Sequence, residues 1–193
     1  GTETSEKDTV GLGNESAGQL LTDIDSHWAE ESIKELVGIG AVSGYPDGTF
    51  RPNNMITRAE FATILVNALE LEQRSGKVYQ DTAGHWAEKT ISTAANYGIV
   101  SGYDENTFGA KDPVTREQMA VMIVRAAKLS QVIEEISFKD KDNISDWAKD
   151  GVTIAINNGI INGYPDQTLR PQGNATRAEA VSVILKTIKS FGE

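Results

Sequence analysis

The sequence predicts an all-α protein, a pseudo-threefold trimer of helix-loop-helix repeats with a central three-helix bundle. Three tryptophans, Trp28, Trp86 and Trp147, are each followed by an arginine 30 residues later. In every interval a glycine precedes that arginine by 14 residues. The arginines are Arg58, Arg116 and Arg177, and the glycines are Gly44, Gly102 and Gly163. Two spacings kept in three copies, at a period of 58 and then 61 residues, are typical of a repeat architecture.

The first helix of each repeat is expected to begin at the tryptophan. In repeat 1, Ile33 and Leu36 lie on one side and charged residues on the other, which is the amphipathic pattern of a peripheral helix. A tryptophan at such a start is expected to pack at the edge of the core rather than to lie exposed. The segment 43–50 that follows is rich in turn-forming residues and is expected to be a tight loop.

The second helix of each repeat is expected to begin after a threonine. In repeat 1, Thr57 and Glu60 form the pattern of a capping box, and Ile56 and Phe61 that of a hydrophobic staple. The capping pattern recurs at Thr115/Gln118 and Thr176/Glu179. The apolar residues that follow cover too wide an arc for a surface helix. The three second helices are therefore expected to bury one another, with the first helices outside them.

The three repeats are expected at residues 21–72, 79–130 and 138–190, as one shared structural unit. Residues 1–20 are rich in Gly, Ser, Thr and Glu, lack the apolar core of a signal peptide, and are interpreted as a flexible tail. The extra residues of the second period lie between Arg116 and Trp147, which indicates that insertions entered a linker and spared the repeats.

Composition argues against several classes of function. The chain has 193 residues, 39% hydrophobic and 24% charged, and no apolar run approaches the roughly 20 residues of a membrane helix, so no membrane insertion is expected. A net charge of -10 without a Lys/Arg cluster argues against nucleic acid as a partner. The absence of cysteine excludes a disulfide framework and a thiolate metal site, and no cofactor is expected.

In these motifs the sequence resembles the S-layer homology (SLH) family. The shared features are an aromatic residue or Leu with an Asp ahead of His-Trp-Ala or Asp-Trp-Ala, a Gly-Tyr loop, and a Thr-Arg-Ala-Glu-like helix start. They extend from residue 21 to about residue 190. The resemblance implies three repeats around a pseudo-threefold axis, with ligand grooves between them.

The resemblance also implies a role, that of a secreted, non-enzymatic module that anchors a protein of the cell wall or S-layer. The implied partner is an acidic polysaccharide, the secondary cell wall polymer of Gram-positive bacteria, which commonly carries pyruvate ketals on N-acetylmannosamine. Neighbouring S-layer subunits would be contacted through the remainder of the protein.

The three arginines are the first candidates for ligand contacts. Each is expected in the first turn of its helix, where the helix dipole disfavours a cation by roughly 0.3–1 kcal/mol unless an anion is near. Free N–H groups at the helix start, together with a guanidinium that pairs with carboxylates, would suit a pyruvate ketal. The alternative is an arginine tied to a neighbouring Asp such as Asp23 or Asp81, and the sequence leaves both roles open.

The resemblance adds further candidate contacts in every repeat. The loop glycines and the tyrosines after them are expected to admit a sugar and to contact it, and the tryptophans to stack on it, although they rank below the arginines. The added candidates are Gly44, Tyr45, Gly102, Tyr103, Gly163, Tyr164, Trp28, Trp86, Trp147, Asp23, Asp81 and Asp140. In repeat 3 we prefer Asp140 to Asp142, because Phe138 precedes Asp140 in the aromatic-x-Asp register.

One loop position separates repeat 2 from the others. Repeats 1 and 3 carry Arg51 and Arg170, each followed by Pro, whereas repeat 2 has Gly109, with Lys111 as a substitute cation nearby. Because a glycine beside a ligand loop commonly marks a close approach, Gly109 is expected to leave room for a ligand and to make the grooves non-equivalent.

Other functions fit the sequence less well. A cell-wall glycoside hydrolase needs one asymmetric carboxylate pair, whereas the carboxylates here recur in every repeat. A metal site on His27 and His85 has Asp146 at the third position. A calcium loop that began with the run 140–143 would have Ser145 in place of its Gly and Gly151 in place of its Glu. A module that binds only other protein copies stays open as an alternative.

Overall fold

The computed structural model describes residues 20–130 and 134–191, and within them the protein is helical, with no β-strand. The elements are α1 (Glu30–Gly38), α2 (Arg58–Ala68), α3 (Glu88–Asn96), α4 (Arg116–Ala126), the short 3-10 helices η1 (Lys141–Asn143) and η2 (Asp146–Ala148), α5 (Lys149–Asn157) and α6 (Arg177–Phe191). The predicted all-α class is confirmed. The predicted tail lies outside the described residues except for residue 20.

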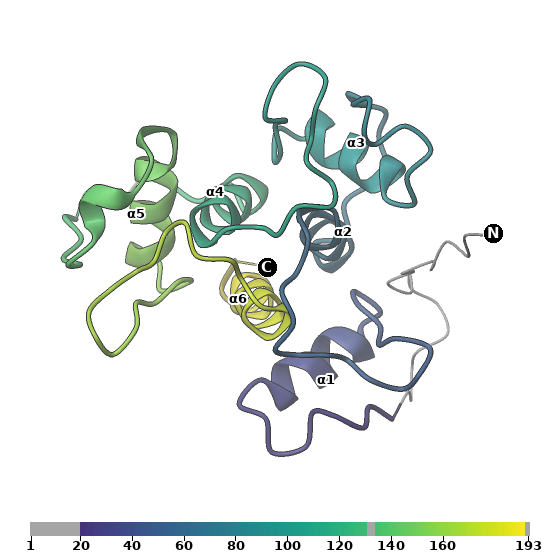
Figure 1. Ribbon diagram of the computed structural model, residues 1–193, viewed down its shortest axis with the longest axis horizontal. Helices are drawn as coiled ribbons and strands as arrows, with labels where there is room; N and C mark the ends of the chain where they lie inside the picture. Colours follow the sequence, from purple (N-terminus) through teal and green to yellow (C-terminus); the bar gives the residue numbers. More distant parts are fainter. Residues whose placement is uncertain (1–19, 131–133, 192–193) are drawn as a thin grey trace, which may run out of the picture.

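The three second helices form the centre of the molecule. In Figure 1, α2, α4 and α6 are seen nearly end-on around one axis, and α1, α3 and α5 lie outside them with their loops. Each outer helix packs on the central helix of another repeat: α3 on α2, α5 on α4, and α1 on α6. The repeats therefore exchange their outer helices in a closed circle.

A ring of backbone hydrogen bonds closes this circle just ahead of the central helices. The N–H of Ile56 donates to the carbonyl of Ala175 at 3.1 Å, that of Ala175 to Val114 at 2.9 Å, and that of Val114 to Ile56 at 2.9 Å. Each repeat thus donates one bond and accepts one. This arrangement satisfies three buried donors and acceptors near the axis, where no water could replace them.

The central helices are buried around most of their circumference. In α2, Phe61, Ile64 and Leu65 are at most 1% exposed, and Met119 and Ile123 of α4 are fully buried. The wide apolar arcs predicted from the sequence are explained, because each central helix contacts two others on the axis side and an outer helix on the far side.

The first helices begin two residues later than predicted. Trp28 lies in a turn and α1 begins at Glu30, while Trp147 lies in η2 and α5 begins at Lys149. In repeats 1 and 2 a histidine holds the turn, as the N–H of Ala29 donates to Nδ1 of His27 at 3.1 Å, with the same bond at His85. A helix cannot start at the tryptophan while this tight turn precedes it.

The expected burial of the tryptophans is wrong for two of the three. Trp28 is 66% exposed and Trp147 is 57% exposed, while Trp86 is half-buried against the core. The turn that delays the helix also directs these rings outward, and the small alanine after each tryptophan is buried in its place. Two large aromatic rings are consequently free to meet a ligand.

The predicted capping boxes form in full in repeats 2 and 3. Thr115 and Gln118 bond reciprocally, and so do Thr176 and Glu179. In repeat 1 the Thr57 hydroxyl accepts from the N–H of Glu60 at 3.1 Å, but the Glu60 carboxylate binds Arg177. Repeat 1 thus shows only the first half of the capping box together with a contact between repeats, whereas Glu179 of repeat 3 makes both the full box and such a contact.

Candidate functional site

The three arginines reach out of their own repeats into the loop of the next one. They are 5%, 7% and 1% exposed in chain order, and in each the Nε–H donates to a loop carbonyl. The bonds are Arg58 to Phe108 at 3.1 Å, Arg116 to Leu169 at 2.8 Å, and Arg177 to Phe50 at 2.9 Å. Each arginine thus joins two repeats, one giving the arginine and the next giving the Gly-Tyr loop.

A tyrosine ring covers each guanidinium. The distance from the Arg58 guanidinium carbon to the ring centre of Tyr103 is 4.7 Å, and the corresponding distances to Tyr164 and Tyr45 are 4.7 Å and 4.9 Å. Such contacts favour a cation electrostatically and leave the edge of the guanidinium for hydrogen bonds. The predicted arginines and loop tyrosines are therefore brought together in all three grooves.

The backbone N–H groups at the helix starts are not free, contrary to expectation. In α2 the N–H of Arg58 donates to the carbonyl of Asp112 at 2.8 Å and that of Ala59 to Ala110 at 3.2 Å. The first residues of α4 and α6 make the same bonds to Gly173, Pro171, Asn54 and Pro52. The segment after the next repeat's loop folds over each helix start, so the guanidinium is left as the main donor for an anion.

The arginines differ in their acidic partners. Nη1 of Arg116 lies 2.6 Å from Oε2 of Glu179, and Nη1 of Arg177 lies 2.5 Å from Oε2 of Glu60. The equivalent position opposite Arg58 is Gln118, and nothing in the described chain bonds to Nη1 of Arg58. The alternative of an arginine tied to Asp23 or Asp81 is not what the structure has, because the partners are glutamates of the next central helix.

Burial affects the pKa of Arg58. Desolvation lowers the pKa of its guanidinium, and the nearby Tyr103 and Asp112 oppose this effect only in part. The group stays a cation at neutral pH because an arginine pKa starts so high. A buried cation without a bonded carboxylate is uncommon, and an anion that entered the groove would stabilise it.

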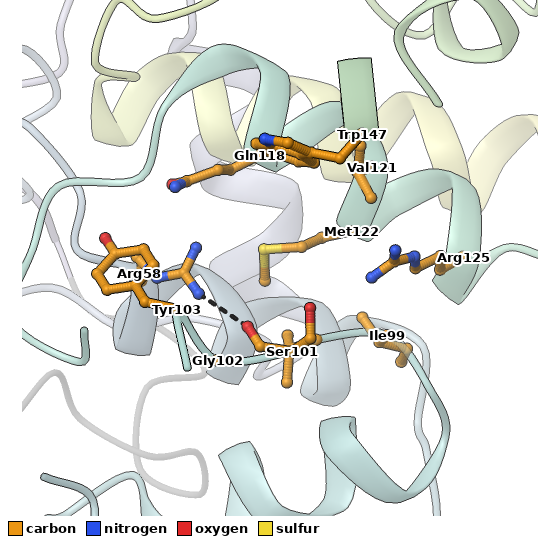
Figure 2. A pocket seen from close by; sticks show the side chains of 11 residues that line it. Arg58, Ile99, Ser101, Gly102, Tyr103, Gln118, Val121, Met122, Arg125 and Trp147 are labelled. Carbon is orange, nitrogen blue, oxygen red and sulfur yellow. Dashed lines mark hydrogen bonds between the residues drawn. The ribbon is translucent and has the colours of Figure 1, made fainter. Parts of the chain in front are cut away.

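A groove of about 440 Å³ opens beside Arg58 (Figure 2). Arg58 and Tyr103 stand at one end, Arg125 at the other, and Gln118 and Trp147 lie along one side. The lining residues are Arg58, Ile99, Val100, Ser101, Gly102, Tyr103, Gln118, Val121, Met122, Arg125 and Trp147. The lining contains two arginines, two aromatic rings and no carboxylate, which suits an anionic sugar.

The chain matches the S-layer homology domain, by the family description, over residues 20–62, 78–120 and 137–181. It belongs to the S-layer homology family. The three matched segments are the three repeats, and the residues that form the grooves lie in or directly after them.

Several curated relatives of the SLH chain are cell-surface proteins or enzymes. An amylopullulanase of Thermoanaerobacterium thermosulfurigenes is 36% identical over 90% of this chain, and the exoglucanase XynX of Acetivibrio thermocellus is 34% identical over 92%. The S-layer protein EA1 of Bacillus anthracis is 32% identical over 92%. The chain spans only 10%, 18% and 21% of these relatives. Its family is one of cell-surface proteins, as the sequence predicted.

The three aspartates shape the loops of the SLH repeats. Each carboxylate accepts backbone N–H groups of its own repeat just before the second helix. The donors are Phe50 and Arg51 for Asp23, Phe108, Gly109 and Ala110 for Asp81, and Leu169 and Arg170 for Asp140, which confirms the preferred register of repeat 3. These bonds hold the loop carbonyls that the arginines use, and a direct ligand contact of the aspartates stays a prediction.

Burial would raise the pKa of the Asp81 carboxyl, but the bonds from the N–H groups of Phe108, Ala110 and Gly109 outweigh it and lower the pKa. The carboxylate is thereby kept charged at neutral pH, when the loop needs it as an acceptor.

Two of the loop glycines, Gly102 and Gly163, pack closely against an aromatic ring of their own repeat. The N–H of Gly102 donates to the hydroxyl of Tyr79 at 2.9 Å, and a Cβ at Gly102 would stand 2.5 Å from the Tyr79 ring. At Gly163 a Cβ would stand 2.1 Å from the ring of Phe138. The Gly102 amide is thus already bonded, and contact of the loop glycines with a sugar stays a prediction.

Gly109 makes room for a tyrosine of its own repeat. Its φ is +81°, and a Cβ there would lie 2.4 Å from the Tyr103 ring. In repeats 1 and 3 the corresponding arginine stacks on the tyrosine instead, Arg51 at 3.9 Å from Tyr45 and Arg170 at 3.8 Å from Tyr164. The expected space beside Gly109 is therefore filled by Tyr103, which leans into the place of the missing arginine.

Residues 20–130 and 134–191 contain neither a candidate metal cluster nor a candidate membrane helix. In residues 20–130 and 134–191 no three His, Cys, Asp or Glu side chains gather where they could hold a metal ion. None of the helices described is long and apolar enough to cross a membrane. Lys111 is exposed and lies near His85, whose pKa is lowered by burial and by this lysine. Lys111 therefore does not take the place on Tyr103 that Arg51 and Arg170 take on the tyrosines of repeats 1 and 3.

Proposed function

We propose that the chain anchors a cell-surface protein to the bacterial wall by binding an acidic wall polysaccharide in the groove between SLH repeats 1 and 2. The observation that carries the proposal is the Arg58 guanidinium, 5% exposed, with Nη1 free of any bonded carboxylate and a groove beside it. Family membership and the S-layer relatives support the anchoring role.

The groove offers a distinct group to each part of such a ligand. A carboxylate would accept from Nη1 of Arg58 in a charge-assisted hydrogen bond, which is about twice as strong as a neutral one. The exposed rings of Tyr103 and Trp147 present apolar faces of the kind that sugars contact. The ligand proposed is a pyruvate ketal on N-acetylmannosamine, because it joins one carboxylate to one sugar ring.

Short-range contacts in the groove have to overcome the repulsion between the negatively charged protein and an anionic ligand. With a net charge of -10 the molecule repels a polyanion at long range, so steering cannot assist association. Binding then depends on short-range contacts in the groove, and it should vary little with salt compared with binding by a basic surface.

A hydrolase is not supported by the arrangement of carboxylates. Glu60 and Glu179 belong to different grooves, and each is held in an ion pair with a buried arginine. The matched part is only 10% and 18% of the two enzymes among the relatives, so their activities are not carried over to this chain. We assign the chain a non-catalytic role.

The test is a titration of the protein with purified wall polymer before and after chemical removal of its pyruvate. Binding to the native polymer and its loss on the treated polymer are expected. Equal binding to both would show that the carboxylate is not recognised, and association of the protein with itself alone would favour the assembly module instead.

A further inference from the structure

The three junctions between repeats differ at the third residue of the central helix that faces each arginine. That residue is Glu60 opposite Arg177, Glu179 opposite Arg116, and Gln118 opposite Arg58. The two glutamates are only partly buried. Each places its Oε2 on Nη1, the same nitrogen that is open in Arg58.

We propose that Gln118 makes the groove between repeats 1 and 2 the ligand-competent groove, and that Glu179 and Glu60 close the other two by binding their arginines as a ligand carboxylate would. This inference rests on the proposed function. It assigns Gln118 as the residue that decides specificity among the three grooves.

The hydrogen bonds of Gln118 show that glutamine can stand in place of glutamate at this position and still cap the helix. Its Oε1 accepts from the N–H of Thr115 at 3.1 Å, as Oε1 of Glu179 accepts from Thr176 at 3.4 Å. Both side chains therefore cap their helix with one atom. The second atom of Glu179 binds Arg116, whereas the Gln118 amide lies beside the hydroxyl of Tyr103, whose ring covers Arg58. In glutamate that second atom is a charged acceptor, whereas in glutamine it is an NH2 group that donates.

A ligand carboxylate would meet opposite conditions in the two kinds of groove. Beside Arg58 it would find the guanidinium and the Gln118 NH2 as donors, with no carboxylate in the lining. Beside Arg116 or Arg177 it would have to displace a bonded glutamate or approach it, and like charges so close repel strongly in a partly buried site.

A second cation separates the groove beside Arg58 from the junction at Arg177, where Asn67 stands, but not from the junction at Arg116, where Lys186 stands. Arg125 of α4 lines the groove beside Arg58, is exposed, and makes no ion pair within the described residues. The residue nine positions after the arginine of the central helix is Arg125 in repeat 2, Asn67 in repeat 1 and Lys186 in repeat 3. The groove with Gln118 thus has two arginines and no glutamate at these positions.

The repeats themselves supply matched variants for the test. Gln118→Glu copies repeats 1 and 3, and Glu60→Gln and Glu179→Gln copy repeat 2, so each change is already tolerated at an equivalent place in this chain. The probe is the methyl glycoside of N-acetylmannosamine bearing a pyruvate ketal, followed by isothermal titration calorimetry. Circular dichroism melts of each variant confirm that it is folded.

We expect one site in the wild type, and in Gln118→Glu a loss of affinity of about tenfold or more, which corresponds to about 1.4 kcal/mol. We expect Glu60→Gln and Glu179→Gln each to add a second site. Two or three sites in the wild type, or unchanged affinity in folded Gln118→Glu, would overturn the inference and leave the proposed function standing. A wild type that does not bind this probe would overturn the proposed function itself.

Discussion

Each central arginine holds the loop of the next repeat, and in Arg58 the nitrogens divide this structural task from the recognition proposed above. In Arg58, Nε and Nη2 bond the carbonyls of Phe108 and Ser101, at 3.1 and 3.2 Å, and hold the loop of the next repeat. Only Nη1 is left for a ligand. In Arg116 the same two bonds reach Leu169 and Asn162, and Nη1 is taken by Glu179. Truncation of any of these arginines should therefore lower the stability of the protein, whereas only truncation of Arg58 should weaken ligand binding.

Arg58→Ala is expected to weaken binding of the pyruvylated polymer by about tenfold or more, because a charge-assisted hydrogen bond is lost. It should also lower the Tm by several degrees, since two loop carbonyls lose their donor at about 1–3 kcal/mol in all and each kcal/mol shifts the Tm of such a chain by about 2–4 °C. Calorimetric titration and thermal melting measure the two effects.

Arg177→Ala is the matched control for this variant. Its Nε bonds the Phe50 carbonyl in the same way, but its groove is closed by Glu60. A similar fall in Tm with unchanged affinity is expected. If both variants lost affinity equally, the effect on binding would come from loosened loops and the role of Arg58 as a ligand contact would be wrong.

The sequence predicted the arginines and their loops, but not what each arginine binds. Equal spacings identify equivalent residues, which is why Arg58, Arg116 and Arg177 were found together. The glutamate that faces an arginine belongs to another repeat and is 117 residues away for Arg177, so no local pattern reveals the pair. For the same reason the sequence predicted only a capping role for Gln118.

At the scale of elements, the outer helices are held by contacts that differ from repeat to repeat. In repeats 1 and 2 a glutamate of the outer helix accepts the N–H two residues before the tryptophan, Glu30 from Ser26 at 2.9 Å and Glu88 from Gly84 at 2.6 Å. Repeat 3 has Lys149 at that helix position. There the buried Glu117 of α4 accepts from the N–H and hydroxyl of Ser145, at 3.0 and 2.7 Å.

Glu117→Ala is therefore expected to lower the Tm by several degrees, because a helix start loses its cap at about 1–2 kcal/mol. It should also loosen Trp147, two residues beyond Ser145, and shift the tryptophan fluorescence. The double variant Glu117→Ala/Lys149→Glu should recover much of the Tm, since it installs the cap of repeats 1 and 2. Failure of the second change to restore stability would show that Glu117 acts in some other way.

Helix boundaries mark where prediction from sequence stops at this scale. The capping pattern placed the starts of α2, α4 and α6 correctly, because the cap is local. The starts of α1, α3 and α5 were placed too early, because their first turns are held by histidine side chains in two repeats and by a residue of another repeat in the third. The exchange of outer helices between repeats was not predicted, since a helix pattern shows which face is apolar but not which helix covers it.

At the scale of the whole molecule, stability depends on closure of the circle. The three second helices and the ring of bonds through Ile56, Val114 and Ala175 need one member from each repeat. α1 of the first repeat packs on α6 of the last, so the two ends of the described chain are joined by packing. No repeat can form its own core from its own two helices, because those helices pack mainly on others.

The fragment of residues 79–130 is accordingly expected to be poorly folded. It contains α3 and α4, but the partner of α3 is α2 in repeat 1 and the outer partner of α4 is α5 in repeat 3. Met119 and Ile123, fully buried in the whole chain, would be exposed to water, and a unit of this size cannot offset the entropy of folding without them.

Circular dichroism of the fragment and of the intact chain under the same conditions is the measurement. A weak helical signal that fades without a cooperative transition is expected of the fragment, beside a sharp transition of the intact chain. A cooperative helical melt of the fragment alone would mean that α3 can pack on α4 within one repeat, and the exchanged arrangement would then not be what holds the molecule together.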